Sequence, residues 1–155
     1  EQPPQPVTEV HMVAGIHPKL GYDYYLDILR AVKEARPEIH IKAFTMIEIV
    51  QIQRIAKKPL EDVFADLRAA GLESIPGGGA EVFSDRVHED LFWTKADSED
   101  WLEIAAAAHR SGLPSNATML YGHVENTEEK LSADGPSSGN HNTQCCQKKF
   151  HICIL

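Results

Sequence analysis

The feature that most constrains the fold is a repeated order in which one short apolar segment precedes one longer segment with helical periodicity. Short segments that favour strands begin near residues 10, 39, 73 and 115. Between them, apolar side chains recur every three or four residues, as from Tyr22 to Val32, which predicts amphipathic helices. Single short strands separated by helices pair in parallel, so the pattern predicts an α/β fold.

Proline and glycine residues mark the predicted ends of these helices. Pro37 ends the helix that begins at Tyr22, because the residue before a proline avoids the helical conformation. Gly71 and Gly112 each follow a helical segment and precede a leucine. Both suit the left-handed position after a helix.

Composition divides the chain into three regions. Residues 1–9 are rich in proline and glutamine and are interpreted as a linker, whereas the alternating pattern occupies residues 10–125. Residues 126–155 are polar and turn-rich, which predicts a disordered tail, although its last few residues could form a small strand. Because residue 1 is Glu rather than Met, we expect the start of the gene product to lie upstream.

Charge and cysteine content narrow the class of protein. The net charge of −8, from 15 Lys and Arg against 23 Asp and Glu, argues against a nucleic-acid partner. No apolar run approaches the ~18 residues of a membrane span, and no signal peptide is visible. The cysteines are Cys145, Cys146 and Cys153, which match no standard zinc spacing. We therefore expect no membrane partner and a reducing, cytoplasmic location.

Polar residues and glycines follow every predicted strand. In parallel α/β folds, ligands bind at the C-terminal ends of the strands. The candidate residues at these ends are Gly15, His17, Thr45, Glu48, Gly77, Gly78, Gly79, Glu81, Asn116, Thr118, Tyr121 and His123.

Each candidate also has a purely structural interpretation. The segment Gly77–Gly79 could expose backbone N–H groups to a polar or anionic ligand, or could form a tight turn. His17 could donate a proton or shape a turn with Pro18. Glu48 and Glu81 could bind an ammonium or hydroxyl group or act in acid–base chemistry, but Glu48 also suits the first turn of a helix.

The polar residues of the fourth predicted strand also have both a functional and a structural interpretation. Asn116, Thr118, Tyr121 and His123 are mixed with apolar residues along this segment. Polar groups inside a parallel sheet are costly unless they are paired. They therefore line a pocket or form hydrogen bonds within the core.

Five segments carry a family resemblance. They are AGIHPKL (14–20), KEARPEIHIKAFTMIEI (33–49), LRAAGLESIPGGGAE (67–81), KADSEDWLE (95–103) and SNATMLYGHVE (115–125). By these segments, about three quarters of the chain resembles the aminofutalosine (aminodeoxyfutalosine) synthases. These enzymes of the radical SAM superfamily belong to menaquinone biosynthesis via futalosine.

The resemblance implies a partial (β/α) TIM-type barrel of about four βα units, and a transferase activity. It implies a [4Fe-4S] cluster that cleaves S-adenosylmethionine (SAM). The 5′-deoxyadenosyl radical then adds to 3-[(1-carboxyvinyl)oxy]benzoate, and loss of carbon dioxide gives aminofutalosine.

The resemblance also assigns the candidate residues. Ala14-Gly15 takes the place of the family's glycine pair near the SAM amino group. The implied cofactor contacts are Gly15, His17, Thr45, Glu48, Gly77, Gly78, Gly79, Glu81 and Asn116. The substrate-pocket candidates are Thr118, Tyr121 and His123.

One motif of the superfamily is absent from these 155 residues. No CxxxCxxC sequence is present, so we expect no cluster ligands in this chain and no activity from it alone. One alternative is therefore a noncatalytic remnant, or half of a split enzyme whose N-terminal half is a separate chain. Another is a barrel enzyme that binds the phosphate of a small-molecule substrate at Gly77–Gly79.

Overall fold

The computed structural model describes most of the chain between residues 7 and 132, together with one strand near the C-terminus. The described residues are 7–13, 15, 17, 19–78, 84, 86–87, 90, 98–118, 122, 124–132 and 150–153. Their elements, in chain order, are β1 (Glu9–Met12), α1 (Tyr22–Ala35), β2 (His40–Ala43), α2 (Met46–Ala56), α3 (Leu60–Ala70), α5 (Ser98–Arg110), β3 (Ser115–Thr118), α6 (Thr127–Ser132) and β4 (Phe150–Cys153).

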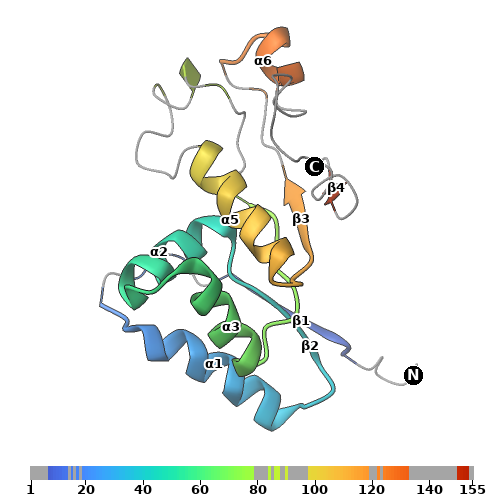
Figure 1. Ribbon diagram of the computed structural model, residues 1–155. Coiled ribbons are helices and arrows are strands. Elements are labelled where there is room, and N and C mark those ends of the chain that lie inside the picture. The colour runs from blue at the N-terminus through green and yellow to red at the C-terminus, as the bar shows by residue number, and fades with distance from the viewer. Residues whose placement is uncertain are drawn as a thin grey trace, which may run out of the picture.

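All the strand pairings are parallel, as the alternating pattern predicts. β1 pairs with β2, and β3 pairs with β4. Ser74 and Ile75 connect the two pairs, because Ser74 bridges to Lys42 of β2 and Ile75 bridges to Ser115 of β3. The helices α1, α2, α3 and α5 lie on one side of these strands (Figure 1). The class is mixed α/β with a small parallel sheet, and a barrel is not evident in the described residues.

The predicted helix ends are confirmed. Gly71 and Gly112 adopt left-handed φ angles of 117° and 79°. After each of them, the amide of Leu72 or Leu113 donates to a carbonyl five residues earlier, at 3.0 and 2.9 Å. Two helices therefore end in the same way, each just before its chain enters the sheet.

The strand boundaries differ from those in the sequence prediction. A strand from Val10 to Gly15 was expected, but β1 ends at Met12, and Gly15 turns the backbone to a φ of 67°. The expected strand at Glu73–Pro76 is reduced to two bridging residues. A helix expected near residues 85–92 falls mostly outside the described residues.

Two further elements lie beyond residue 125. Asn126 begins α6, because its side chain accepts from the Glu129 amide at 2.9 Å and its own amide donates to the Glu129 carboxylate at 2.7 Å. This is a capping box, a pattern readable from Asn126 and Glu129. The small strand expected in the last few residues is present as β4. The domain boundaries remain a prediction.

The core lies between the helices and the sheet. Leu29 of α1, Leu67 of α3 and Ile41 of β2 are fully buried. Burial of such a side chain contributes about 1.5–3 kcal/mol relative to its exposure. Within the described residues, no helix is long and apolar enough to cross a membrane.

Candidate functional site

The candidate site lies where the parallel strands end. β2 leads through Phe44 to Thr45, the bridging residues lead to Gly77, and β3 ends at Thr118. Because all the strands run in the same direction, these ends meet at one edge of the sheet. We call it the C-terminal edge.

Gly77 lies against β3 more closely than any other residue type allows. Its amide donates to the Oδ1 atom of Asn116 at 3.0 Å. A Cβ atom at this position would lie 2.9 Å from both the Asn116 carbonyl oxygen and the Thr118 nitrogen, which are backbone atoms. Glycine is therefore required here for packing, and the polar Asn116 side chain is used to secure the turn.

Gly78 contacts two other elements. Its φ of 142° suits only glycine, and a Cβ atom would lie 3.1 Å from the methyl group of Thr45. On α5, the indole Nε1 atom of Trp101 donates to the Gly78 carbonyl oxygen at 3.0 Å. Trp101 is one of the apolar residues at helical spacing in its segment, which predicts that it is buried, and it is 2 % exposed; the sequence did not predict this hydrogen bond. A buried indole N–H needs a hydrogen-bond acceptor, so the sequence could have indicated that Trp101 has an acceptor, though not which one.

Thr45 and Glu48 bond to each other at the start of α2. The Thr45 amide and hydroxyl donate to Oε2 of Glu48 at 2.8 and 2.9 Å, and the Glu48 amide donates back to the hydroxyl at 3.4 Å. Glu48 is buried. The two candidates form a capping box, whose Thr-x-x-Glu spacing was readable from the sequence. The first-turn interpretation of Glu48 is therefore confirmed.

Phe44 shapes the turn from β2 into this cap. Its φ of 63° is left-handed, a conformation that costs a side-chain-bearing residue roughly 1–2 kcal/mol. The ring is buried and packs edge-on against Tyr25, with 5.6 Å between the ring centroids. The core thus fixes the conformation that places Thr45 at the C-terminal edge.

Gly15 and His17 are not joined to this group of residues. Both are exposed, and Nδ1 of His17 accepts from the Lys19 amide at 3.2 Å, a contact within its own turn. A Cβ atom on Gly15 would meet nothing within 4 Å. The structure therefore brings together Thr45, Glu48, Gly77, Gly78, Asn116 and Thr118. The candidates Gly79, Glu81, Tyr121 and His123 lie outside the described residues.

An ion pair connects α6 to Arg86, which lies in the chain segment between Gly78 and α5. Nε and Nη2 of Arg86 donate to the two carboxylate oxygens of Glu129 at 2.9 and 2.7 Å, and Ser84 donates to Glu129 at 2.9 Å. Nη2 of Arg86 also donates to the Val124 carbonyl oxygen at 3.1 Å. Hydrogen bonds from Arg86 and from the Asn126 amide lower the pKa of Glu129 to about 2. We call this pair the Arg86–Glu129 clasp, and the sequence did not reveal it.

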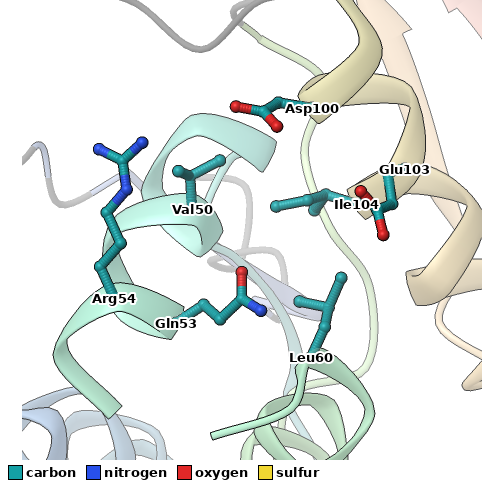
Figure 2. Close-up of a pocket in the computed structure, with 7 residues that line it drawn as sticks. All are labelled: Val50, Gln53, Arg54, Leu60, Asp100, Glu103 and Ile104. Carbon is teal, nitrogen blue, oxygen red and sulfur yellow. The ribbon is translucent and has the colours of Figure 1, made fainter. Parts of the chain in front are cut away.

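A separate cavity of about 150 Å³ lies between the helices. Figure 2 shows its lining side chains, which come from α2, the start of α3 and α5. They are Val50, Gln53, Arg54, Leu60, Asp100, Glu103 and Ile104. None of them is a candidate from the strand ends.

The donor atoms of the residues that the structure describes do not fit an iron–sulfur cluster. The sequence has no CxxxCxxC motif, and the described residues gather no group of three His, Cys, Asp or Glu side chains that could hold a metal. The C-terminal edge instead offers glycine backbone, a hydroxyl group and an amide. Such groups can form hydrogen bonds with a small polar ligand.

The fold and this edge define a parallel α/β protein with a candidate ligand site at the ends of its strands. A family model described as the Radical SAM superfamily matches residues 3–133, so the chain belongs to that superfamily. The matched residues include every candidate and also α6. Members of this superfamily are enzymes that use SAM and a [4Fe-4S] cluster.

Two similar members of the superfamily share one name. The chain is 49% identical over 125 residues to the aminodeoxyfutalosine synthase of Thermus thermophilus, covering 81% of this chain and 34% of that protein. It is 42% identical over 125 residues to the Streptomyces coelicolor enzyme of the same name, covering 81% and 32%.

A relative with a different name is also similar. The chain is 38% identical over 125 residues to the 5-amino-6-(D-ribitylamino)uracil–L-tyrosine 4-hydroxyphenyl transferase 1 of Methanosarcina mazei, covering 81% and 33%. The chain thus spans about a third of the length of the curated relatives it matches.

Proposed function

We propose that this chain is the SAM- and substrate-binding part of an aminodeoxyfutalosine synthase. The reaction would transfer the 5′-deoxyadenosyl group of SAM to 3-[(1-carboxyvinyl)oxy]benzoate, and loss of carbon dioxide would give aminofutalosine. The identity of 49% to the Thermus enzyme, against 38% to the Methanosarcina transferase, supports this member of the superfamily.

One observation carries the assignment of the site. The turn at Gly77 and Gly78 is held against Asn116 of β3 and Thr45 of α2 at the edge where parallel strands end. Backbone with no side chain allows a ligand to approach closely, and Asn116 and Thr45 are the neighbouring polar groups. SAM, with its charged amino-acid end and its ribose hydroxyls, suits such groups.

The cluster ligands would come from outside these 155 residues. When bound, the cluster supplies the electron that cleaves SAM. The part proposed for this chain is to bind SAM and the aromatic carboxylate substrate, and to hold them beside each other.

The test is anaerobic reconstitution with iron and sulfide, first of this chain alone and then with a polypeptide that carries CxxxCxxC and the preceding strands. We expect 5′-deoxyadenosine only from the combination, and aminofutalosine when 3-[(1-carboxyvinyl)oxy]benzoate is added. If the combination forms a product from 5-amino-6-(D-ribitylamino)uracil and tyrosine, and none from 3-[(1-carboxyvinyl)oxy]benzoate, the proposed substrate is wrong. Formation of 5′-deoxyadenosine by the chain alone would contradict the origin proposed for the cluster ligands.

A second proposal concerns the partner that such an enzyme requires. In the described part of the chain, one side of β1 pairs with β2, and no strand pairs with its other side. Val10 and Met12 pack partly against the core, whereas Glu9 and His11 are exposed. An open strand edge pairs readily with another strand. We therefore propose that a strand from the cluster-bearing half adds at β1.

The oligomeric state tests this second proposal. Mixing with the cluster-bearing half should give a 1:1 complex, and changing His11 to Pro should prevent it. A proline at the neighbouring exposed position Val7, outside β1, is the control. Complex formation that is unaffected by His11→Pro would contradict pairing at β1.

A further inference from the structure

The glycine-rich turn at the C-terminal edge is contacted from three elements. β3 contributes the Asn116 side chain, which accepts from the Gly77 amide at 3.0 Å. α2 contributes the methyl group of Thr45, close to Gly78. α5 contributes the indole of Trp101, which donates to the Gly78 carbonyl oxygen at 3.0 Å. Trp101 itself lies in the core, and this hydrogen bond joins it to the turn.

The hydrogen bond from Trp101 holds the Gly78 carbonyl group in one direction. A peptide group is planar, and its N–H points opposite to its carbonyl. A donor that fixes the Gly78 carbonyl oxygen therefore restricts rotation about the Cα–C bond of Gly78, and with it the direction of the peptide unit that follows this residue. Gly78 needs such a constraint, because glycine at a φ of 142° has few steric barriers to rotation.

We propose that Trp101 is a positioning residue for ligand binding, whose indole N–H orients the Gly77–Gly78 turn toward a ligand at the C-terminal edge. This inference rests on the proposed function, because the ligand is taken to be SAM. It assigns to a buried aromatic residue a role beyond packing. Trp101 lies on a helix and orients the backbone that would meet the ligand.

Two substitutions separate the hydrogen bond from the packing. Trp101→Phe removes the N–H and part of the ring. Replacement of Trp101 by 3-benzothienylalanine keeps the shape of the ring system but puts sulfur in place of the N–H. Phe64→Leu is the matched control, since Phe64 is also fully buried but belongs to α3 and is not among the residues in contact with the turn.

Two measurements on the full chain test the proposal. Isothermal titration with SAM should show about a fivefold to tenfold loss of affinity in both Trp101 variants, the size expected for one lost hydrogen bond. Hydrogen exchange should accelerate at Gly77 and Gly78 in both variants, with α5 still protected. Phe64→Leu should lower the melting temperature without changing either property.

The outcomes separate this inference from the proposed function. If the unmodified chain binds SAM and the benzothienyl variant binds it equally well, Trp101 does not act as proposed. If the unmodified chain does not bind SAM, the proposed site is wrong. The exchange measurement still decides the role of Trp101 in that case, and unchanged exchange at Gly77 and Gly78 would overturn it.

Discussion

The two edges of the small parallel sheet are built from different chemistry. At the N-terminal edge, charged groups bond to one another. Nζ of Lys33 donates to the Glu73 carboxylate and to the Ile39 carbonyl oxygen, both at 2.7 Å. The same carboxylate accepts from the Ile41 amide at 2.9 Å, and Nε2 of His40 lies 2.7 Å from the Ser74 hydroxyl.

At the C-terminal edge the contacts are mostly between neutral groups and glycine backbone. Asn116 and Trp101 bond to main-chain atoms of the turn, and the Glu48 carboxylate bonds to Thr45. In parallel α/β folds, the N-terminal face serves stability and the C-terminal face serves function. At the strand ends themselves, charged side chains form the contacts of the N-terminal edge, and glycine backbone with the Asn116 amide forms those of the C-terminal edge; the Arg86–Glu129 clasp lies further along the chain. Charge alone would therefore not have indicated the edge where we propose the ligand site.

We expect the largest loss of stability from a substitution at the C-terminal edge, Gly77→Ala. In Gly77→Ala the new methyl group would meet backbone of β3 at 2.9 Å, so the strand must shift. Overpacking of this kind costs about 2–3 kcal/mol. Urea denaturation should show this loss, whereas Gly21→Ala, which would meet nothing within 4 Å, should be tolerated. Equal stability of the two variants would contradict the close approach of the turn to β3.

We expect the next largest loss of stability at the N-terminal edge, from Glu73→Gln. Burial raises the pKa of this carboxyl, but hydrogen bonds from Lys33 and the Ile41 amide outweigh it and lower the pKa below 4.5. A lowered pKa means stability that is present at neutral pH and lost as the pH falls through the folded-state value. With Glu73 partly exposed, we expect a loss of about 1.5 kcal/mol at pH 7.

Denaturation at several pH values checks this prediction. The difference between Glu73→Gln and the unmodified chain should be constant near neutral pH and should shrink as the pH falls below the ordinary pKa of a glutamate carboxyl, about 4.3. The control is Glu38→Gln, which removes an exposed pair with Arg36 and should leave the melting temperature unchanged. A difference that stays constant over the whole pH range would show that the ion pair does not stabilise this edge.

A smaller effect separates the two roles of Thr45. Thr45→Ala removes the hydroxyl of the capping box and should cost about 1 kcal/mol. Thr45→Ser keeps the hydroxyl but removes the methyl group that lies near Gly78. Thermal denaturation should place Thr45→Ser close to the unmodified chain. If Thr45→Ser were as unstable as Thr45→Ala, the contact with Gly78 would matter more than the cap.

The smallest effect concerns the Arg86–Glu129 clasp. Glu129→Gln removes its charge, so amides of residues 126–130 should exchange a few-fold faster while α3 keeps its protection. In the unmodified chain the protection of these amides, measured relative to their intrinsic exchange rates at each pH, should be lost only near pH 2, where Glu129 becomes protonated. Unchanged exchange in Glu129→Gln would show that α6 is ordered by other contacts.

The sequence predicted what depends on local chemistry. The ends of α1, α3 and α5 follow from Pro37, Gly71 and Gly112, whose backbone preferences act within a few residues. The parallel pairing follows from the order of the segments. The capping box of Thr45 and Glu48 is also readable from their Thr-x-x-Glu spacing, although both residues are candidates for the ligand site as well.

The remainder of the site depends on contacts between segments far apart in the chain. The need for glycine at Gly77 comes from Asn116 and Thr118, 39 and 41 positions further along. No local pattern encodes that approach, nor the contact of Trp101 with Gly78. The left-handed φ of Phe44 was equally hidden, because an aromatic residue adopts it only when surrounding packing requires it.

We propose that the C-terminal edge binds SAM and that the N-terminal edge does not. The most direct test of this proposal is isothermal titration of SAM into the unmodified chain, Asn116→Ala and Ser74→Ala. Asn116→Ala should weaken binding about tenfold through the loss of polar contacts, and Ser74→Ala at the opposite edge should bind as the unmodified chain does. Equal affinities in all three proteins, or a loss confined to Ser74→Ala, would contradict the account.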